Sequence, residues 1–129
     1  MAIQIVRLGT ARNKNEGIRI GAVRRPPRGI PRAEFASEDW FDVRLPNISP
    51  SPEAVKQRHS AKTTAQLNAF LKKFKGEMSR PDAVHILDLL AVLSHKTNFS
   101  LGCYCESEEF CHRSILRALL IERGAKVKA

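Results

Sequence analysis

The order of predicted elements in the C-terminal third constrains the fold most. Residues 82–93 are apolar on most of a helical circumference, which predicts a helix covered on more than one side. Residues 99–104 then predict a strand, and residues 115–120 an amphipathic helix that ends at Gly124. Alternating helices and strands are typical of α/β folds. We therefore predict a layered α/β sandwich whose small sheet is at least partly parallel and is flanked by helices.

Three further strands and two further helices are predicted before this region. The strands are indicated by alternating, branched or aromatic side chains over residues 3–8, 18–22 and 40–45. Ser51, Pro52 and Glu53 supply an N-cap, a first-turn proline and an acidic first turn, which predict a helix start. Apolar residues at helical spacing predict the second helix over residues 67–78.

The length and hydropathy of the chain limit the class of protein. A chain of 129 residues with 43% hydrophobic and 27% charged residues suits one foldable domain. No apolar run approaches the roughly 20 residues of a membrane-spanning helix, and residues 1–7 lack the order of a signal peptide. We therefore predict a single α/β domain over residues 1–129, with a short basic tail at 126–129, in a soluble cytoplasmic protein without a membrane partner.

Positive charge is concentrated near the N-terminus. The chain has 22 Lys and Arg against 13 Asp and Glu, a net charge of +9; residues 1–32 hold eight of the basic residues and one acidic residue, and the remainder is nearly balanced. Prolines at 26, 27 and 31 make residues 24–32 a basic loop, because proline fixes φ and has no amide to donate. This charge favours an anionic partner, either a small anionic ligand such as phosphate or nucleic acid, and a solvated basic surface is the alternative.

All three cysteines lie within nine residues, which is typical of local chemistry in a reducing compartment rather than of a disulfide framework. The predicted elements put Cys103 at the end of a strand and Cys111 at the start of the last helix. The Cys-rich loop 103–113 therefore lies where ligands gather in α/β sheets. A helix N-terminus next to His112 and Arg113 is expected to lower the pKa of the Cys111 thiol.

Three interpretations of this loop are open. In the first, Cys111 is a catalytic nucleophile or redox thiol and His112 a general acid or base. An anionic ligand is then bound by basic and hydroxyl side chains, those of Arg24, Arg28, Arg44, Arg113 and Ser114. In the second, zinc is the cofactor, and its ligands are Cys103, Cys105, Cys111 and His112. An adjacent pair such as Cys111 and His112 converges poorly on one ion from a helix. In the third, the cysteines only fill the core, and Arg113 pairs with a carboxylate such as Asp42.

Three blocks of the sequence, taken in order, resemble the domain-of-unknown-function 488 family, the YeaO-like proteins. The blocks are residues 18–30, which contain Pro-Arg-Gly; residues 41–51, which end in Ile-Ser-Pro-Ser; and residues 101–113, which end in Cys-His-Arg. The similarity spans nearly the whole chain. It implies an α/β fold with a pocket where the Pro-Arg-Gly loop, the Asp42 strand and the Cys-His-Arg turn meet. It implies no reaction, because the family is functionally uncharacterised.

The sequence therefore favours an anion-binding α/β domain, for a phosphate or nucleotide-like ligand, with a reactive thiol. Nucleic-acid binding through the basic N-terminal third and a zinc-stabilised interaction module are the alternatives. The chain contains no Walker loop, dinucleotide-binding glycine motif, His-Glu-x-x-His or Cys-x-x-Cys, so no enzyme class is assigned. The sequence assigns no oligomeric state.

Overall fold

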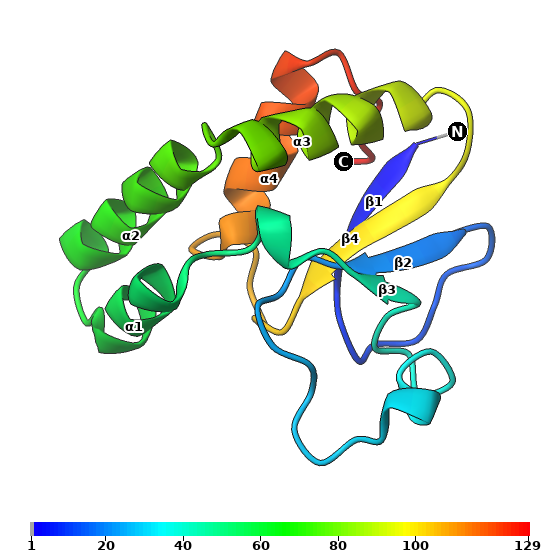
Figure 1. Ribbon diagram of the computed structural model, residues 1–129, viewed down its shortest axis with the longest axis horizontal. Coiled ribbons are helices and arrows are strands. Elements are labelled where there is room, and N and C mark those ends of the chain that lie inside the picture. The colour runs from blue at the N-terminus through cyan, green and yellow to red at the C-terminus, as the bar shows by residue number, and fades with distance from the viewer. Residues whose placement is uncertain (1) are drawn as a thin grey trace.

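Four parallel strands form one sheet in the computed structural model, which describes residues 2–129 (Figure 1). The strands are β1 (Ile3–Arg7), β2 (Ile18–Gly21), β3 (Val43–Arg44) and β4 (Phe99–Cys103), in the order β1-β4-β2-β3. Every neighbouring pair is parallel, and β4 is hydrogen-bonded between β1 and β2. The α/β prediction is therefore confirmed, and the sheet, predicted to be at least partly parallel, is parallel throughout.

Four helices pack against the sheet: α1 (Pro52–Ser60), α2 (Thr64–Glu77), α3 (Pro81–Leu93) and α4 (His112–Glu122). Two of the starts follow from local chemistry, since Ser51 Oγ accepts the Ala54 N–H and Thr63 forms a reciprocal capping box with Gln66. Figure 1 shows α1 and α2 as a hairpin to one side of the sheet. Within residues 2–129, no helix is long and apolar enough to cross a membrane.

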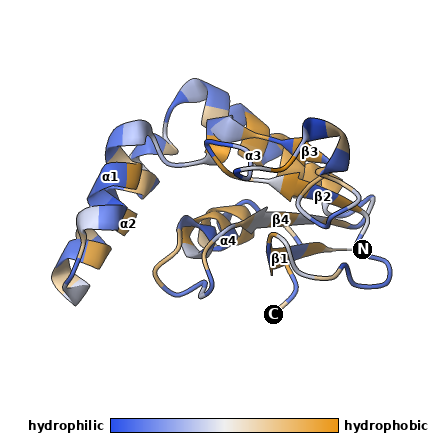
Figure 2. Cartoon of the chain, turned by 90° about the horizontal axis from the view of Figure 1, so that it is seen from below, coloured by the Kyte–Doolittle hydropathy of each residue, from blue (hydrophilic) through white to orange (hydrophobic). Residues whose placement is uncertain are grey.

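The main core lies between one face of the sheet and helices α2, α3 and α4. Alternate strand residues project into it, as the two-residue period of a strand requires, and these are Ile3, Ile20, Phe99 and Leu101. The helices contribute buried apolar side chains, chiefly Phe74, Leu87, Leu90, Leu116 and Leu120. Figure 2 shows hydrophobic residues concentrated along α3 and α4 and mostly hydrophilic residues along α1 and α2. All five residues of β4 are buried, as expected for a central parallel strand.

Loops rather than helices cover the opposite face of the sheet. A Cβ atom on Gly21 would lie 2.7 Å from the ring of Phe41, and a Cβ atom on Gly102 would lie 2.6 Å from Leu8 Cδ2. Phe41 and Leu8 therefore pack directly on the backbone of β2 and β4, where a side chain would push them away. They belong to a second hydrophobic cluster that reaches the cysteines at the end of β4.

The strand predicted over residues 40–45 is shorter in the structure, because only Val43–Arg44 joins the sheet. Asp39 has a positive φ of 63°, and the Trp40 N–H donates to Phe35 O at 2.9 Å. The chain is therefore still turning at residue 40, and aromatic content alone overpredicted the strand.

The basic loop 24–32 and the basic tail 126–129 differ in how regular their structure is. Residues 24–31 form a loop, as predicted, and a short 3₁₀ turn begins at Arg32. The basic tail at 126–129 instead lies along β1, where the Lys128 N–H donates to Ile3 O and Val127 pairs with Ile3 in parallel.

Candidate functional site

The cysteines and His112 gather at the carboxyl end of β4. Cys103 is the last residue of this strand, Cys111 is the N-cap of α4, and His112 is the first residue of that helix. The predicted place of the Cys-rich loop, between a strand end and a helix start, is therefore confirmed. Cys103, Cys111 and His112 are buried, with 1%, 1% and 7% of their surfaces exposed.

Three of these side chains turn their electron-pair donors toward one another. Cys103 Sγ and Cys111 Sγ are 2.7 Å apart, and Cys111 Sγ is 3.7 Å from His112 Nδ1. The donor atoms of all three side chains lie within 4.8 Å of one another. All the cysteines are free. The cluster thus offers two sulfurs and one ring nitrogen to a common point.

The imidazole of His112 is held in one tautomer. Its Nε2 lies 2.6 Å from the backbone oxygen of Ala22, the residue that follows β2. A carbonyl oxygen can only accept a hydrogen bond, so Nε2 carries the proton and Nδ1 presents its lone pair toward Cys111 Sγ. Burial lowers the pKa of His112, which keeps the ring neutral. The Phe74 ring packs edge-on against the imidazole, with centroids 5.2 Å apart, and fixes its plane.

Cys111 and His112 can point at one place because Cys111 lies outside the helix. Its backbone is extended, with φ −97° and ψ 150°, and its Sγ accepts the Arg113 N–H at 3.5 Å as a helix cap. The expectation that adjacent residues converge poorly on one ion assumed that both lay on the helix. For this pair the expectation is wrong.

Cys105 is the half-buried member of the group, and its N–H donates to Cys103 Sγ at 3.4 Å. Hydrogen bonds from the thiols of Cys103 and Cys111 lower the pKa of Cys105 far below the usual range, and the contact with Cys105 raises the pKa of Cys103. The contact with Cys103 lowers the pKa of Cys111, but the contact with Cys105 and burial outweigh it and leave that pKa raised.

The prediction of a lowered pKa for Cys111 is therefore wrong in direction. It considered the helix N-terminus and the flanking His and Arg, but not the other two thiols, which compete for a single negative charge. The pKa that is lowered is that of Cys105, a residue predicted from the sequence only as a zinc ligand. The Cys-x-Cys spacing at the end of a strand was the signal that could have found it.

Arg113 is a buried cation that ties β1 to the cysteine loop. Its guanidinium donates to Val6 O at 2.6 Å and to Cys105 O at 2.9 Å. The expected pairing with Asp42 is wrong, because that carboxylate pairs with Arg12 at 2.8 Å. In the described part of the chain, Arg113 Nε has no hydrogen-bond partner. The positive charge lies close enough to the three thiols to favour their ionised forms.

Among residues 2–129, the other predicted anion-binding side chains either donate to backbone oxygens or are exposed. Arg24, Arg44 and Ser114 donate to backbone oxygens at 3.1, 2.6 and 2.8 Å. Arg28 is exposed on the basic loop. Two cavities, of about 250 and 170 Å³, lie beside β1 and between α1 and α2, away from these four side chains. Anion binding by this set stays a prediction.

Two basic segments border the cysteine loop. The Tyr104 hydroxyl donates to Arg25 O at 2.7 Å, which holds the basic loop 24–32 on one side. Arg58 Nε donates to Phe110 O at 3.2 Å, which holds α1 on the other. These two hydrogen bonds therefore hold the cysteine loop between two cationic elements.

Comparisons with known proteins bear on the family of the chain. Searches of curated proteins and of solved structures give no match. A family model, DUF488-N3a, described as the active DUF488-N3 subclade, matches residues 3–124. This match covers nearly the whole chain, including the basic loop and the cysteine cluster, and it confirms the resemblance noted in the sequence. The protein therefore belongs to the DUF488-N3a family.

Proposed function

We propose that the cluster is a metal centre in which Cys103, Cys111 and His112 bind one zinc ion and Cys105 supplies the fourth ligand. The observation that carries the proposal is the convergence of two buried sulfurs and an imidazole lone pair within 4.8 Å. Thiolate and neutral imidazole are the donors that zinc prefers in closed tetrahedral sites. The function is then that of a zinc-stabilised α/β module.

One of the two donor distances already fits a tetrahedral ion. With zinc bonds of about 2.3 Å to sulfur and about 2.0 Å to nitrogen, neighbouring donor atoms lie roughly 3.5–3.8 Å apart. The Cys111 Sγ to His112 Nδ1 distance of 3.7 Å falls in this range. The Cys103 to Cys111 distance of 2.7 Å has to lengthen by about 1 Å, which repulsion between two thiolates favours.

The surroundings of the cluster also support a metal. The Ala22 carbonyl fixes the tautomer of His112, which is the usual role of an oxygen behind a metal-bound imidazole. Zinc with three thiolates and one histidine carries one negative charge, and the buried Arg113 guanidinium supplies the positive charge that compensates it. An ion at this point joins the end of β4 to the start of α4.

Elemental analysis tests the proposal. Protein purified without a metal-affinity tag should contain about one zinc ion per chain, and Cys103→Ser, Cys111→Ser and His112→Gln should each lose most of it. His85→Gln, which changes an exposed histidine, is the matched control and should keep its zinc. In the cobalt-substituted protein, Cys105→Ser should lower the thiolate charge-transfer band by about one third, because one of three thiolates is removed. A wild-type protein that stays substoichiometric after zinc loading and dialysis would contradict the proposal.

The second candidate function is a reactive thiol acting on an anionic ligand. It is supported by the half-burial of Cys105 at the carboxyl end of the sheet and by the two cationic elements that hold its loop. Alkylation followed by mass spectrometry separates the two functions. A metal centre predicts that Cys105 is protected until a chelator is added, whereas a reactive thiol predicts rapid alkylation with or without the chelator.

A further inference from the structure

Two segments carry the whole net charge of the protein. Residues 24–32 and 52–80 together hold eleven Lys and Arg against two Glu, a net of +9, which equals the net charge of the chain. The second segment is the α1–α2 hairpin and the turn after it. The net charge beyond residue 32 is nearly balanced and conceals this concentration, because residues 33–51 hold four acidic residues against one basic residue, while residues 81–129 are neutral in sum.

Part of the N-terminal charge is neutralised inside the fold. Arg12 pairs with Asp39 and Asp42, and Arg19 pairs with the buried Glu16. By contrast, several exposed cations of the two basic segments take part in no ion pair among residues 2–129. They are Arg25, Arg28 and Arg32 in the loop and Lys56, Lys62, Lys72 and Lys75 in the hairpin. The available charge is therefore on these elements, not on the N-terminal third as a whole.

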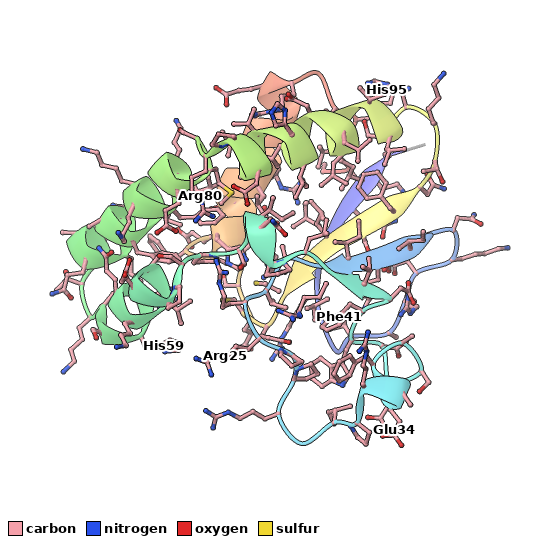
Figure 3. All side chains as sticks on the ribbon, in the orientation of Figure 1. Arg25, Glu34, Phe41, His59, Arg80 and His95 are labelled. Carbon is pink, nitrogen blue, oxygen red and sulfur yellow. The ribbon has the colours of Figure 1, made fainter. Side chains whose placement is uncertain are left out.

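The basic loop and α1 are adjacent in space. Arg24 Nε donates to Pro50 O at 3.1 Å, two residues before α1 begins. In the view of Figure 3, Arg25 and His59 project to the same side of the molecule. Lys56 lies one turn before His59 and therefore shares its helix face. We use the name basic face for Arg25, Lys56 and His59 together with Arg28, which is exposed on the same loop as Arg25.

We infer that the basic face binds the sugar–phosphate backbone of a nucleic-acid duplex. Unpaired guanidinium and ammonium groups on two elements suit a regularly charged backbone, because neutralising several phosphates releases bound counterions. The loop is stiffened by its prolines and pinned by the Tyr104 hydroxyl and by Arg44, which donates to Arg24 O. Its arginines are therefore presented with little loss of chain entropy on binding.

The two basic segments lack large exposed apolar side chains, and this argues against a membrane surface as the partner. Lipid-binding surfaces interleave basic residues with apolar ones that enter the bilayer. The large exposed apolar side chains of this protein are Ile18, Val43, Leu89, Val92 and Ile121, and none of them lies in residues 24–32 or 52–80.

The shortage of exposed aromatic rings argues against a single strand. Proteins that bind single strands stack the bases on aromatic side chains, with about 1–3 kcal/mol for each base. No Phe, Tyr or Trp of residues 2–129 is exposed, so the protein offers no such platform. Contact with the backbone of a duplex needs none.

Fluorescence anisotropy with a labelled duplex of mixed sequence tests the inference. The wild type should bind with a salt-dependent affinity, and Arg25→Ala combined with Arg28→Ala should reduce the slope of log K against log salt by about two, since each lost phosphate contact removes about 0.9. Arg25→Lys combined with Arg28→Lys should restore the slope. Lys14→Ala combined with Lys96→Ala removes the same charge from exposed positions elsewhere and should leave the slope unchanged.

Four results would overturn the inference. They are equal loss in the Lys14 and Lys96 double variant, an affinity independent of salt, tighter binding to a single strand of the same sequence, and equal binding to anionic phosphatidylserine vesicles. The basic face contains none of the proposed zinc ligands. Loss of zinc from the cysteine variants and loss of duplex binding from the arginine variants are therefore separate results, and either proposal can fail alone.

Discussion

Two buried polar clusters among residues 2–129 differ in how far their atoms satisfy one another. On the loop-covered face, the Arg19 guanidinium donates to the Glu16 carboxylate at 2.7 and 3.0 Å and to two backbone oxygens at 2.8 Å. The Ser100 hydroxyl completes this ion pair at 2.7 Å from Glu16. At the carboxyl end of β4, by contrast, Cys103, Cys111 and His112 bring sulfurs and a lone pair together.

The difference separates the cluster that its own protein groups satisfy from the one that we propose as a metal centre. In the Glu16–Arg19 pair, every guanidinium nitrogen donates to a protein acceptor, so the cluster is complete without an added ligand. In the cysteine cluster, the two sulfurs and the imidazole nitrogen meet only through sulfur contacts of 2.7 and 3.7 Å, and sulfur is a weak donor and acceptor. We propose that a zinc ion completes this set. Each cluster can be tested by changing one of its members.

Breaking the complete cluster should have the largest effect. Glu16→Gln leaves the Arg19 guanidinium buried without a counter-charge, so we expect a loss of about 3–5 kcal/mol in the free energy of unfolding. Urea denaturation measures it. Glu53→Gln, at an exposed helix position, is the control and should stay within about 0.5 kcal/mol of the wild type. Equal stability of the two variants would show that the ion pair contributes nothing to the fold.

Removing the proposed ligand from the other cluster should have a comparable effect. A bound ion stabilises the folded state by about 4 kcal/mol when free zinc is 1,000 times its dissociation constant. We therefore expect a chelator to lower the melting temperature of the wild type and to leave that of Cys103→Ser unchanged. Equal shifts in both proteins would show that the chelator acts elsewhere.

Acid should weaken the complete cluster within a defined range of pH. Burial raises the pKa of Glu16, but hydrogen bonds from Arg19 and Ser100 outweigh it and lower the pKa from 4.5 to about 2. The unfolded chain then binds more protons than the folded one between these values, so stability is fully present above pH 4.5 and is lost as the pH falls toward 2. The loss amounts to about 3 kcal/mol. Urea titrations at pH 5, 4 and 3 should show this slope in the wild type, and Glu16→Gln should flatten it.

The smallest effect is expected from the hydroxyl that completes the ion pair. Ser100→Ala removes one hydrogen bond to a buried carboxylate, while Arg19 and the Asn13 N–H still satisfy Glu16. We expect a loss of about 2 kcal/mol in the free energy of unfolding. Ser60→Ala, at an exposed helix end, should cost less than about 0.5 kcal/mol. A loss as large as that of Glu16→Gln would mean that Ser100 is indispensable to the pair.

The fold was predictable where its signals are local. Ser51 and Pro52 are typical of a helix start, and α1 begins at Pro52. Residues 99–103, which lie between two predicted helices, are typical of a strand, and they form the buried strand β4. The Cys-rich loop then had to lie between β4 and α4. The third strand was overpredicted because the turn that ends at residue 40 depends on a contact with Phe35.

The site was predictable in its members but not in its contacts. His112 is oriented by a carbonyl 90 positions away, and Arg113 donates to one 107 positions away. Nothing in the local pattern marks a main-chain oxygen as a partner, so a carboxylate was expected for Arg113. The charges of the three thiols also depend on their mutual distances, which the spacing of the cysteines does not determine.

The tail that lies along β1 has a consequence for how the sheet ends. As an outer strand, β1 has backbone groups that another chain could pair with, which is a common route to aggregation. The Ile3 N–H donates to Lys126 O and Ile3 O accepts the Lys128 N–H, both at 2.8 Å, so the tail occupies that edge where the strand begins. Residues 126–128 thus protect this edge of the sheet. A fusion or truncation at residue 126 would leave the edge free to pair with strands of other chains.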